Sequence, residues 1–159
     1  MPYGNGSTDV GLTGMIELMT PVGLHRTIPA LPVRDMRAAV AYYRERFDFQ
    51  ARHETEGFAV LVRDDATIHL WAASDENWRA RDDLIQEPIR SGAESFLAGT
   101  ASCRIEVDDV DALFAELAAA QVLHRVSSGG VTVTDFGTRE FATVDLDNNA
   151  IAFFRWENH

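Results

Sequence analysis

Few side chains in this sequence have the type and spacing that chemistry at a protein site requires. The chain holds five histidines and one cysteine, beside 25 aspartates and glutamates. Neither His69 nor Glu106 stands in a local motif such as H-E-x-x-H, which places metal ligands and a base on one helix face. If the fold brings these two residues together, they could hold a metal weakly, do acid–base work, or form a hydrogen-bonded polar pair.

The single cysteine, Cys103, excludes an internal disulfide and agrees with a reducing cytoplasm. It lies in an apolar run over residues 101–107, so we expect a packed thiol and not a nucleophile.

Composition limits the class of protein and its partners. Of the 159 residues, 46% are hydrophobic and 25% are charged, which is typical of a soluble globular domain. The formal net charge is −11 without any run of lysine or arginine, so we expect neither nucleic acid nor an anionic membrane surface as a partner. An acidic surface attracts a cationic ligand, or it simply keeps a cytosolic protein soluble. Residues 1–9 lack a secretory signal and no run approaches about 18 apolar residues, so we predict a cytoplasmic protein.

An internal repeat defines the elements that must position any site. Residues 31–36 (LPVRDM) and 105–110 (IEVDDV) share an apolar, alternating run that ends at an aspartate, Asp35 or Asp109. An apolar stripe with helical spacing follows each aspartate. The pattern predicts a strand, an aspartate N-cap and an amphipathic helix, twice in one chain.

The rest of the chain completes two modules with the same order of elements. We predict helices over residues 35–47 and 109–120. We predict strands over residues 25–33, 49–54, 58–62, 67–72, 101–107, 122–127, 138–145 and 150–156, the strand over 122–127 being weak. Turn residues at 56–57, 64–65 and 147–149 predict hairpins, and residues 128–137 a longer loop.

This order predicts an α+β fold in which two βαβββ modules form a curved, half-open, barrel-like sheet. The modules span residues 22–75 and 101–159 of one structural domain. Residues 1–21 are expected to form a flexible arm, and residues 76–100 a long loop between modules.

Specific motifs resemble the vicinal oxygen chelate superfamily, which contains glyoxalase I, the bleomycin-resistance proteins and the extradiol dioxygenases. Besides the doubled strand–aspartate–helix unit, these are residues 136–141 (FGTREF) and 145–151 (DLDNNAI). Residues 63–68 (RDDATI) and the run from Gly137 to Asp145 are most similar to the bleomycin-resistance branch. The resemblance covers about residues 24–156.

The enzymes of this superfamily hold a divalent metal through four inward side chains, and the resemblance places these positions at Ile28, His69, Ser102 and Ala152. Only His69 could coordinate a metal, whereas a catalytic site needs about three protein ligands. We therefore expect no metal ligands, no catalytic residues and no cofactor.

The resemblance also indicates which side chains line a cleft. Strand alternation, counted from those four positions, turns Thr67, Trp71, Arg104, Glu106, Phe154 and Trp156 inward with His69 and Ser102. Phe58 and Phe136 stand where the bleomycin-resistance branch places ring-stacking aromatics, while Arg104 stands where it often has a tryptophan, and His53 where it usually has a phenylalanine.

Trp78 lies in the inter-module loop, where it either folds back on the core or faces a ligand. Phe154 is expected to be ordinary core. The expected ligand-binding residues are Phe58, His69, Trp71, Trp78, Arg104, Glu106 and Phe136.

The leading hypothesis is a metal-free protein that binds and sequesters a drug-sized, planar or cationic antibiotic. The alternatives are a metal-dependent lyase, isomerase or oxygenase with an atypical site around His69 and Glu106, and a metal-independent lyase or isomerase that uses His69 as a base. Because this family commonly builds ligand clefts between subunits, the resemblance implies a homodimer, with the N-terminal segment and the first strand at the seam. Arg139 and Glu140 are expected to form a structural ion pair.

Overall fold

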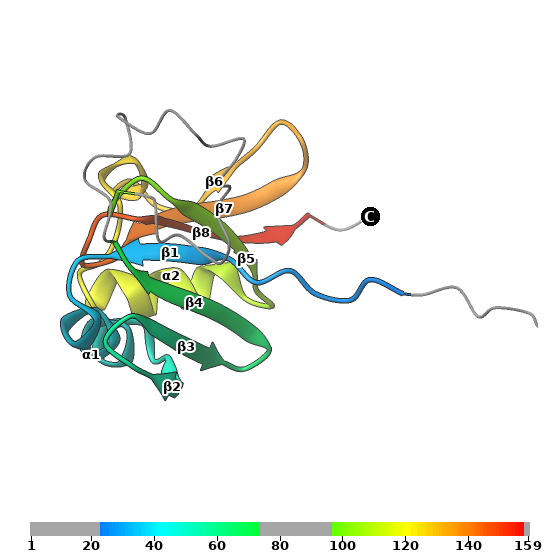
Figure 1. Cartoon of the computed structure of the whole chain (residues 1–159). Coiled ribbons are helices and arrows are strands. Elements are labelled where there is room, and N and C mark those ends of the chain that lie inside the picture. The colour runs from blue at the N-terminus through cyan, green and yellow to red at the C-terminus, as the bar shows by residue number, and fades with distance from the viewer. Residues whose placement is uncertain (1–22, 74–96, 158–159) are drawn as a thin grey trace, which may run out of the picture.

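The computed structural model describes residues 23–73 and 97–157 (Figure 1). The predicted arm over residues 1–21 and most of the predicted loop over residues 76–100, including Trp78, lie outside these residues. The described elements follow one another as β1 (Ala30–Val33), α1 (Met36–Phe47), β2 (Gln50–Glu54), β3 (Phe58–Arg63), β4 (Ala66–Ala72), β5 (Ser102–Glu106), α2 (Val110–Ala119), the 3-10 helix η2 (Arg125–Ser127), β6 (Thr132–Val133), β7 (Thr138–Val144) and β8 (Ala150–Trp156).

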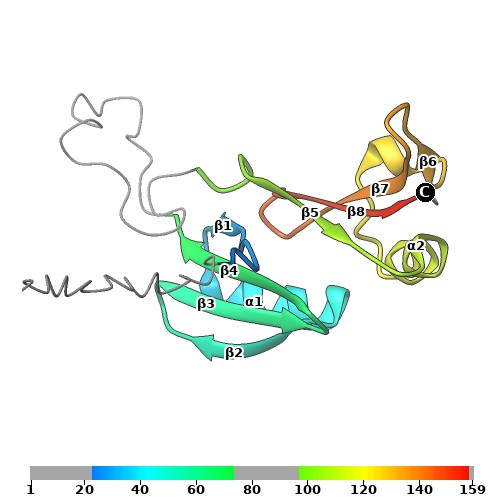
Figure 2. The same ribbon diagram turned by 90° about the vertical axis from the view of Figure 1, so that its right-hand side faces the viewer.

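The predicted repeat is confirmed, because both modules have the same topology. The first sheet has the order β1-β4-β3-β2 and the second the order β5-β8-β7-β6. In each, the first strand lies at an edge and runs parallel to the last strand, while the other pairs are antiparallel. Figure 2 shows the two modules side by side, each with its helix against its own sheet.

The two helices begin as the sequence predicts. The Asp35 carboxylate accepts a hydrogen bond from the backbone N–H of Ala38, and Asp109 accepts one from Ala112, each at 2.9 Å. Both bonds satisfy backbone donors that the first helical turn leaves free. None of the described helices has the length and the apolar character that a membrane span needs.

Two predicted strands differ from the structure. The first strand begins at Ala30 and not at residue 25, and residues 23–29 run as extended chain away from the sheets (Figure 1). The strand predicted over residues 122–127 is wrong: that segment forms one bridge at Leu123 and then η2, and the edge strand β6 lies inside the predicted loop. The apolar residues Val122 and Leu123 pack against the core, and Leu123 forms the one bridge of this segment, to Thr143 of β7.

A buried turn joins the two modules. The carboxylate of Asp145, between β7 and β8, accepts hydrogen bonds from the backbone N–H groups of Asp147 and Asn149, from the Asn149 side chain and from the hydroxyl of Tyr43 on α1. Asn149 also donates to the carbonyl of Pro32 in β1 at 2.8 Å. Burial raises the pKa of Asp145, while these hydrogen bonds oppose the rise. The hydroxyl of Tyr43 is held protonated, since burial and the neighbouring Asp145 raise its pKa well above the usual value.

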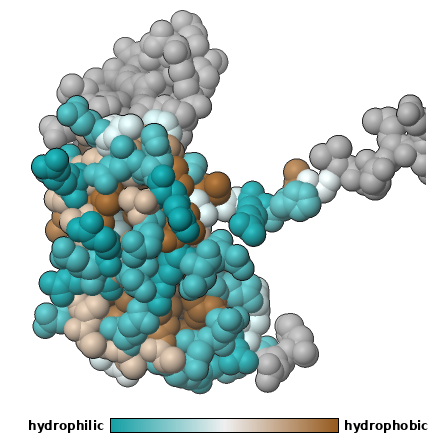
Figure 3. Space-filling view, turned by 90° about the horizontal axis from the view of Figure 1, so that it is seen from below, coloured by the Kyte–Doolittle hydropathy of each residue, from teal (hydrophilic) through white to brown (hydrophobic). Residues whose placement is uncertain are grey.

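Each helix covers one face of its sheet and leaves the other face accessible. Ala59, Leu61, Ile68 and Leu70 are buried under α1, whereas the residues between them on β3 and β4 are only half-buried. In β5, the half-buried Cys103 and Ile105 alternate with exposed residues. The surface seen from below is largely hydrophilic, with apolar residues in small separate areas (Figure 3). The faces opposite the helices are therefore where a ligand can reach the sheets.

Candidate functional site

An aromatic group occupies the open face of the first sheet. We call it the first-sheet cluster: His53, Phe58, His69 and Trp71. The ring centroid of Phe58 lies 4.6 Å from that of Trp71, 5.0 Å from His69 and 5.9 Å from His53. Sheet pairing explains the grouping, because Phe58 is opposite Trp71 on the neighbouring strand, and both His53 and His69 are opposite Val60.

Two side chains in the first-sheet cluster offer hydrogen-bonding groups to a ligand. The indole nitrogen Nε1 of Trp71 is buried and has no hydrogen-bond partner among residues 23–73 and 97–157, a state that costs free energy unless an acceptor binds. Burial lowers the pKa of His69, so its imidazole is neutral at pH 7 and offers one donor and one acceptor. Stacking surface and hydrogen-bonding groups thus lie together.

A second group occupies the open face of the other sheet. We call it the Arg104 cluster: Arg104, Phe136, Glu140, Phe154 and Trp156. The guanidinium carbon of Arg104 lies 4.6 Å from the ring centroid of Phe154 and 5.5 Å from that of Phe136. Its Nη2 atom forms an ion pair with Glu140. The Phe154 and Trp156 rings meet edge to face at 5.9 Å.

Two expectations about this sheet are wrong. Arg139 and Glu140 do not pair with each other: Arg139 binds Asp111 of α2 at 2.6 Å, and Glu140 binds Arg104. Neighbouring residues of a strand point to opposite faces, and this alternation was the signal that the two side chains must have different partners. Phe154 is half-buried beneath the guanidinium of Arg104 and so is not plain core.

The structure brings the expected ligand residues together in two sets. Phe58, His69 and Trp71 meet on the first sheet, and Arg104 meets Phe136 on the second. Glu106 is exposed on β5, two residues from Arg104, and no hydrogen bond joins it to His69 in the described parts of the chain. The fold therefore gives no acid–base pair of His69 and Glu106, and Trp78 lies outside the described residues.

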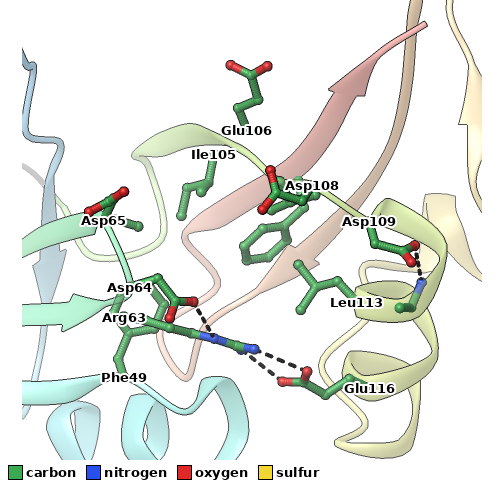
Figure 4. A pocket seen from close by; sticks show the side chains of 14 residues that line it. Phe49, Arg63, Asp64, Asp65, Ile105, Glu106, Asp108, Asp109, Leu113 and Glu116 are labelled. Atoms are coloured by element: carbon green, nitrogen blue, oxygen red, sulfur yellow. Dashed lines mark hydrogen bonds and ion pairs between the residues drawn. The ribbon is translucent and has the colours of Figure 1, made fainter.

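Between the modules lie two adjoining grooves. One, of about 680 Å³, is bordered by residues 26–29, by Thr67 and by Arg104. The other, of about 440 Å³, has Phe49, Leu113 and Phe153 in its lining and carboxylates at its rim (Figure 4). Arg63 crosses the second groove to Glu116 of α2, with N–O distances of 2.8 and 3.1 Å. Asp65, Ala66, Ile105 and Glu106 line both grooves, so the two share a wall.

The donor set does not fit the divalent metal that enzymes of this fold use. Of the four positions, Ile28 and Ala152 have hydrocarbon side chains, and Ser102 has a neutral hydroxyl on an exposed strand position. His69 alone is a strong ligand, and its nearest aromatic neighbour is Phe58. Within residues 23–73 and 97–157 no three His, Cys, Asp or Glu side chains gather as a metal-binding group.

Cys103 is also unsuited to chemistry. It is half-buried against the core, and burial, with a smaller contribution from Asp145, raises the pKa of its thiol to about 11. The thiol is therefore protonated at neutral pH, and the expectation that it packs against the core is confirmed.

Comparison with known proteins supports the resemblance found in the sequence. A bleomycin resistance protein of Geobacillus stearothermophilus is 44% identical over 130 residues, which cover 82% of this chain and 96% of that protein. A bleomycin resistance protein of Staphylococcus aureus matches with the same identity and coverage.

Solved structures with lower identity have the same fold. A bleomycin-binding protein from Streptomyces verticillus, in complex with copper(II)-bleomycin, superposes with a TM-score of 0.63 at 24% identity, covering 87% of this chain and all of that one. A bleomycin resistance determinant encoded on the transposon Tn5 gives 0.62 at 19% identity, covering 85% of this chain and all of that one.

The family model confirms that the whole two-module unit takes part in this likeness. It spans residues 23–153, from the extended segment before β1 into the last strand, and includes both the first-sheet cluster and most of the Arg104 cluster. With the relatives at 44% identity, this match establishes that the chain belongs to the glyoxalase/bleomycin resistance protein/dioxygenase superfamily.

Proposed function

We propose that this protein binds a bleomycin-type glycopeptide antibiotic and sequesters it without catalysis or metal. The observation that carries the proposal is the 44% identity to bleomycin resistance proteins over 96% of their length. The site supports it, because two aromatic faces with hydrogen-bonding groups suit a planar, polar, drug-sized molecule. The side chains at the four metal positions of the fold give no support to a metal-dependent lyase, isomerase or oxygenase.

Sequestration requires tight binding and abundant protein, but it requires no reactive group. A bound antibiotic cannot reach its target, so the free concentration falls once the protein exceeds the drug and the Kd lies below the toxic concentration. A Kd of about 1 μM corresponds to about −8 kcal/mol and one of 1 nM to about −12 kcal/mol. Stacking and hydrogen bonding to two aromatic clusters can supply free energies in this range.

The same proposal includes a cytoplasmic homodimer as the binding unit. The first-sheet cluster and the Arg104 cluster lie on the open faces of different sheets, and each leaves one side of a ligand uncovered. A second copy that places one cluster opposite the other would enclose the ligand. The extended segment before β1 exposes 99% of Leu24 and 47% of Ile28, apolar surface that suits burial against a partner subunit.

Fluorescence titration of the purified protein with metal-free bleomycin tests the proposal. Trp71 and Trp156 belong to the two clusters, so saturable quenching with a submicromolar Kd is expected. Expression of the protein in sensitive bacteria should raise the inhibitory concentration of bleomycin, and the recovered drug should be chemically unchanged. Absence of any signal at micromolar bleomycin contradicts the proposal, and a modified drug would replace sequestration with catalysis.

A further inference from the structure

The Arg104 cluster holds a guanidinium beside two aromatic rings and a carboxylate. The guanidinium carbon lies 4.6 Å from the ring centroid of Phe154 and 5.5 Å from that of Phe136. Its partner Glu140 is itself fixed, because the Thr138 hydroxyl donates to the same carboxylate oxygen at 3.0 Å. Thr138 is fully buried and lies 2.8 Å from the hydroxyl of Thr134. A chain of contacts thus sets the orientation of the arginine before any ligand binds.

The charge of Arg104 is compensated within the cluster. Glu140 carries the opposite charge and is partly buried, so the pair presents little net charge to a ligand. What the pair presents is a flat, polarisable surface. A guanidinium stacks on planar conjugated rings, which a lysine ammonium cannot do in the same way.

The surface remains accessible. The Arg104 side chain is 44% exposed, and it borders the groove of about 680 Å³ between the modules. Glu140 is its only hydrogen-bond partner within the described ranges, whereas a guanidinium has five N–H donors. Donors are therefore left for acceptor atoms at the edge of a bound ring.

We propose that Arg104, held in position by Glu140, is the specificity-determining residue of the site and selects a planar conjugated ring system with hydrogen-bond acceptors at its edge. The inference rests on the proposed binding of bleomycin-type glycopeptides and names the part of the ligand that this arginine recognises. Glu140 is a positioning residue, which acts on the ligand through Arg104. Because the pair is close to neutral, a positive charge elsewhere on the ligand is tolerated.

A pair of antibiotics that differ in planarity tests the role of Arg104. Bleomycin has two conjugated thiazole rings in one plane, whereas in phleomycin one of the rings is reduced and the plane is lost. The wild-type protein should bind bleomycin about tenfold more tightly than phleomycin in calorimetric titrations. The R104K variant keeps the positive charge and replaces the planar guanidinium with an ammonium, so the preference for bleomycin over phleomycin should fall to about twofold or less. R104Q provides the same comparison should R104K fold poorly.

A second pair of ligands tests the role of Glu140. Bleomycin ends in a cationic group, and bleomycinic acid ends in a carboxylate at the same place. E140Q leaves the charge of Arg104 uncompensated, so the ratio of the bleomycin affinity to the bleomycinic acid affinity should fall by about threefold or more. If Glu140 had a merely structural role, E140Q would lower the affinities for both ligands equally and leave their ratio unchanged.

The neighbouring residue of β7 supplies a matched control. Arg139 points to the opposite face and binds Asp111 of α2, so R139K should leave both affinity ratios as in the wild type. An unchanged bleomycin preference in R104K and R104Q overturns the inference while the proposed function stands. Failure of the wild-type protein to bind either antibiotic overturns both.

Discussion

At the scale of single residues, the two clusters divide the work of binding between different chemistries. The first-sheet cluster offers the rings of Phe58 and Trp71, with the buried indole N–H of Trp71 and the neutral imidazole of His69 as hydrogen-bonding groups. The Arg104 cluster offers a guanidinium that lies beside the ring of Phe154, with the ring of Phe136 nearby. A ligand in contact with both must be planar enough to stack and polar enough to satisfy these groups.

Phe58 should be the largest single contributor in the first-sheet cluster, because it touches all three other members. Phe58→Ala removes the stacking surface and should weaken bleomycin binding by about tenfold to a hundredfold. Calorimetric titration measures the change. Val126→Ala is the control, since Val126 is exposed on η2, outside both clusters. An affinity for Phe58→Ala within about twofold of the wild type would remove the first-sheet cluster from the site.

His69 should make binding depend on pH. Its folded-state pKa is lowered by burial, so the imidazole becomes charged only as the pH falls below the ordinary value for histidine, 6.5. Protonation in the folded state then opposes a cationic ligand, and the affinity for bleomycin should decrease from pH 7 toward pH 5. The free energy of unfolding should change in the same direction. The unfolded chain binds this proton at a higher pH than the folded protein does, so the free energy of unfolding decreases as the pH falls through this range.

Titrations at several pH values with H69Q test this expectation. The variant should lose the decrease in affinity, whereas H53Q, which alters the exposed histidine of the same cluster, provides the control. A pH dependence that H69Q leaves intact would assign the titration to another group.

At the scale of elements, the turn between β7 and β8 fastens the second module to α1 and β1. The Tyr43 hydroxyl donates to Asp145 at 2.9 Å, and this contact is fully buried on the tyrosine side. Arg34 of the β1–α1 connection also donates to Asp147, from both its backbone and its side chain, at 3.1 Å. The relative position of the two clusters therefore depends on a polar contact between modules.

Tyr43→Phe should lower the free energy of unfolding by about 1.5–3 kcal/mol, because a buried hydrogen bond to a carboxylate is lost while the ring is kept. Urea denaturation measures the loss. Tyr42→Phe is a matched control: Tyr42 is the adjacent residue of α1, only partly buried, and its hydroxyl makes no hydrogen bond within the described residues. Equal effects of the two substitutions would contradict the role assigned to Asp145.

Much of this element structure could be predicted from the sequence, because its causes are local. Asp35 and Asp109 precede apolar helical stripes, and both cap the helices as expected. The partner of Glu140 could not be predicted, because Arg104 lies 36 residues away on a strand that meets β7 only through β8. The strand β6 has two residues, too few to show a periodicity, and so it was missed.

At the scale of the whole molecule, the open faces and the extended segment before β1 belong to the proposed dimer. Ile28→Asp places a charge on this segment and should convert the dimer to monomers in sedimentation equilibrium, with a matching loss of bleomycin affinity. Val126→Asp adds the same charge at another exposed apolar position and should remain dimeric. A monomeric wild-type protein that binds bleomycin tightly would contradict the dimeric site.

The side-chain amide of Asn149 is bonded to both modules, so the chain cannot be cut between them without loss of these hydrogen bonds. Its nitrogen donates to Pro32, 117 positions earlier, and its oxygen accepts from Gly99 and Ala101 at the entrance to the second module. Although the halves look like duplicates, the first is not self-sufficient: a fragment of residues 23–73 alone would leave the Pro32 carbonyl without its donor, Asn149, and the Tyr43 hydroxyl without its acceptor, Asp145. Cutting the polypeptide between the halves should therefore yield two pieces that regain structure only when mixed.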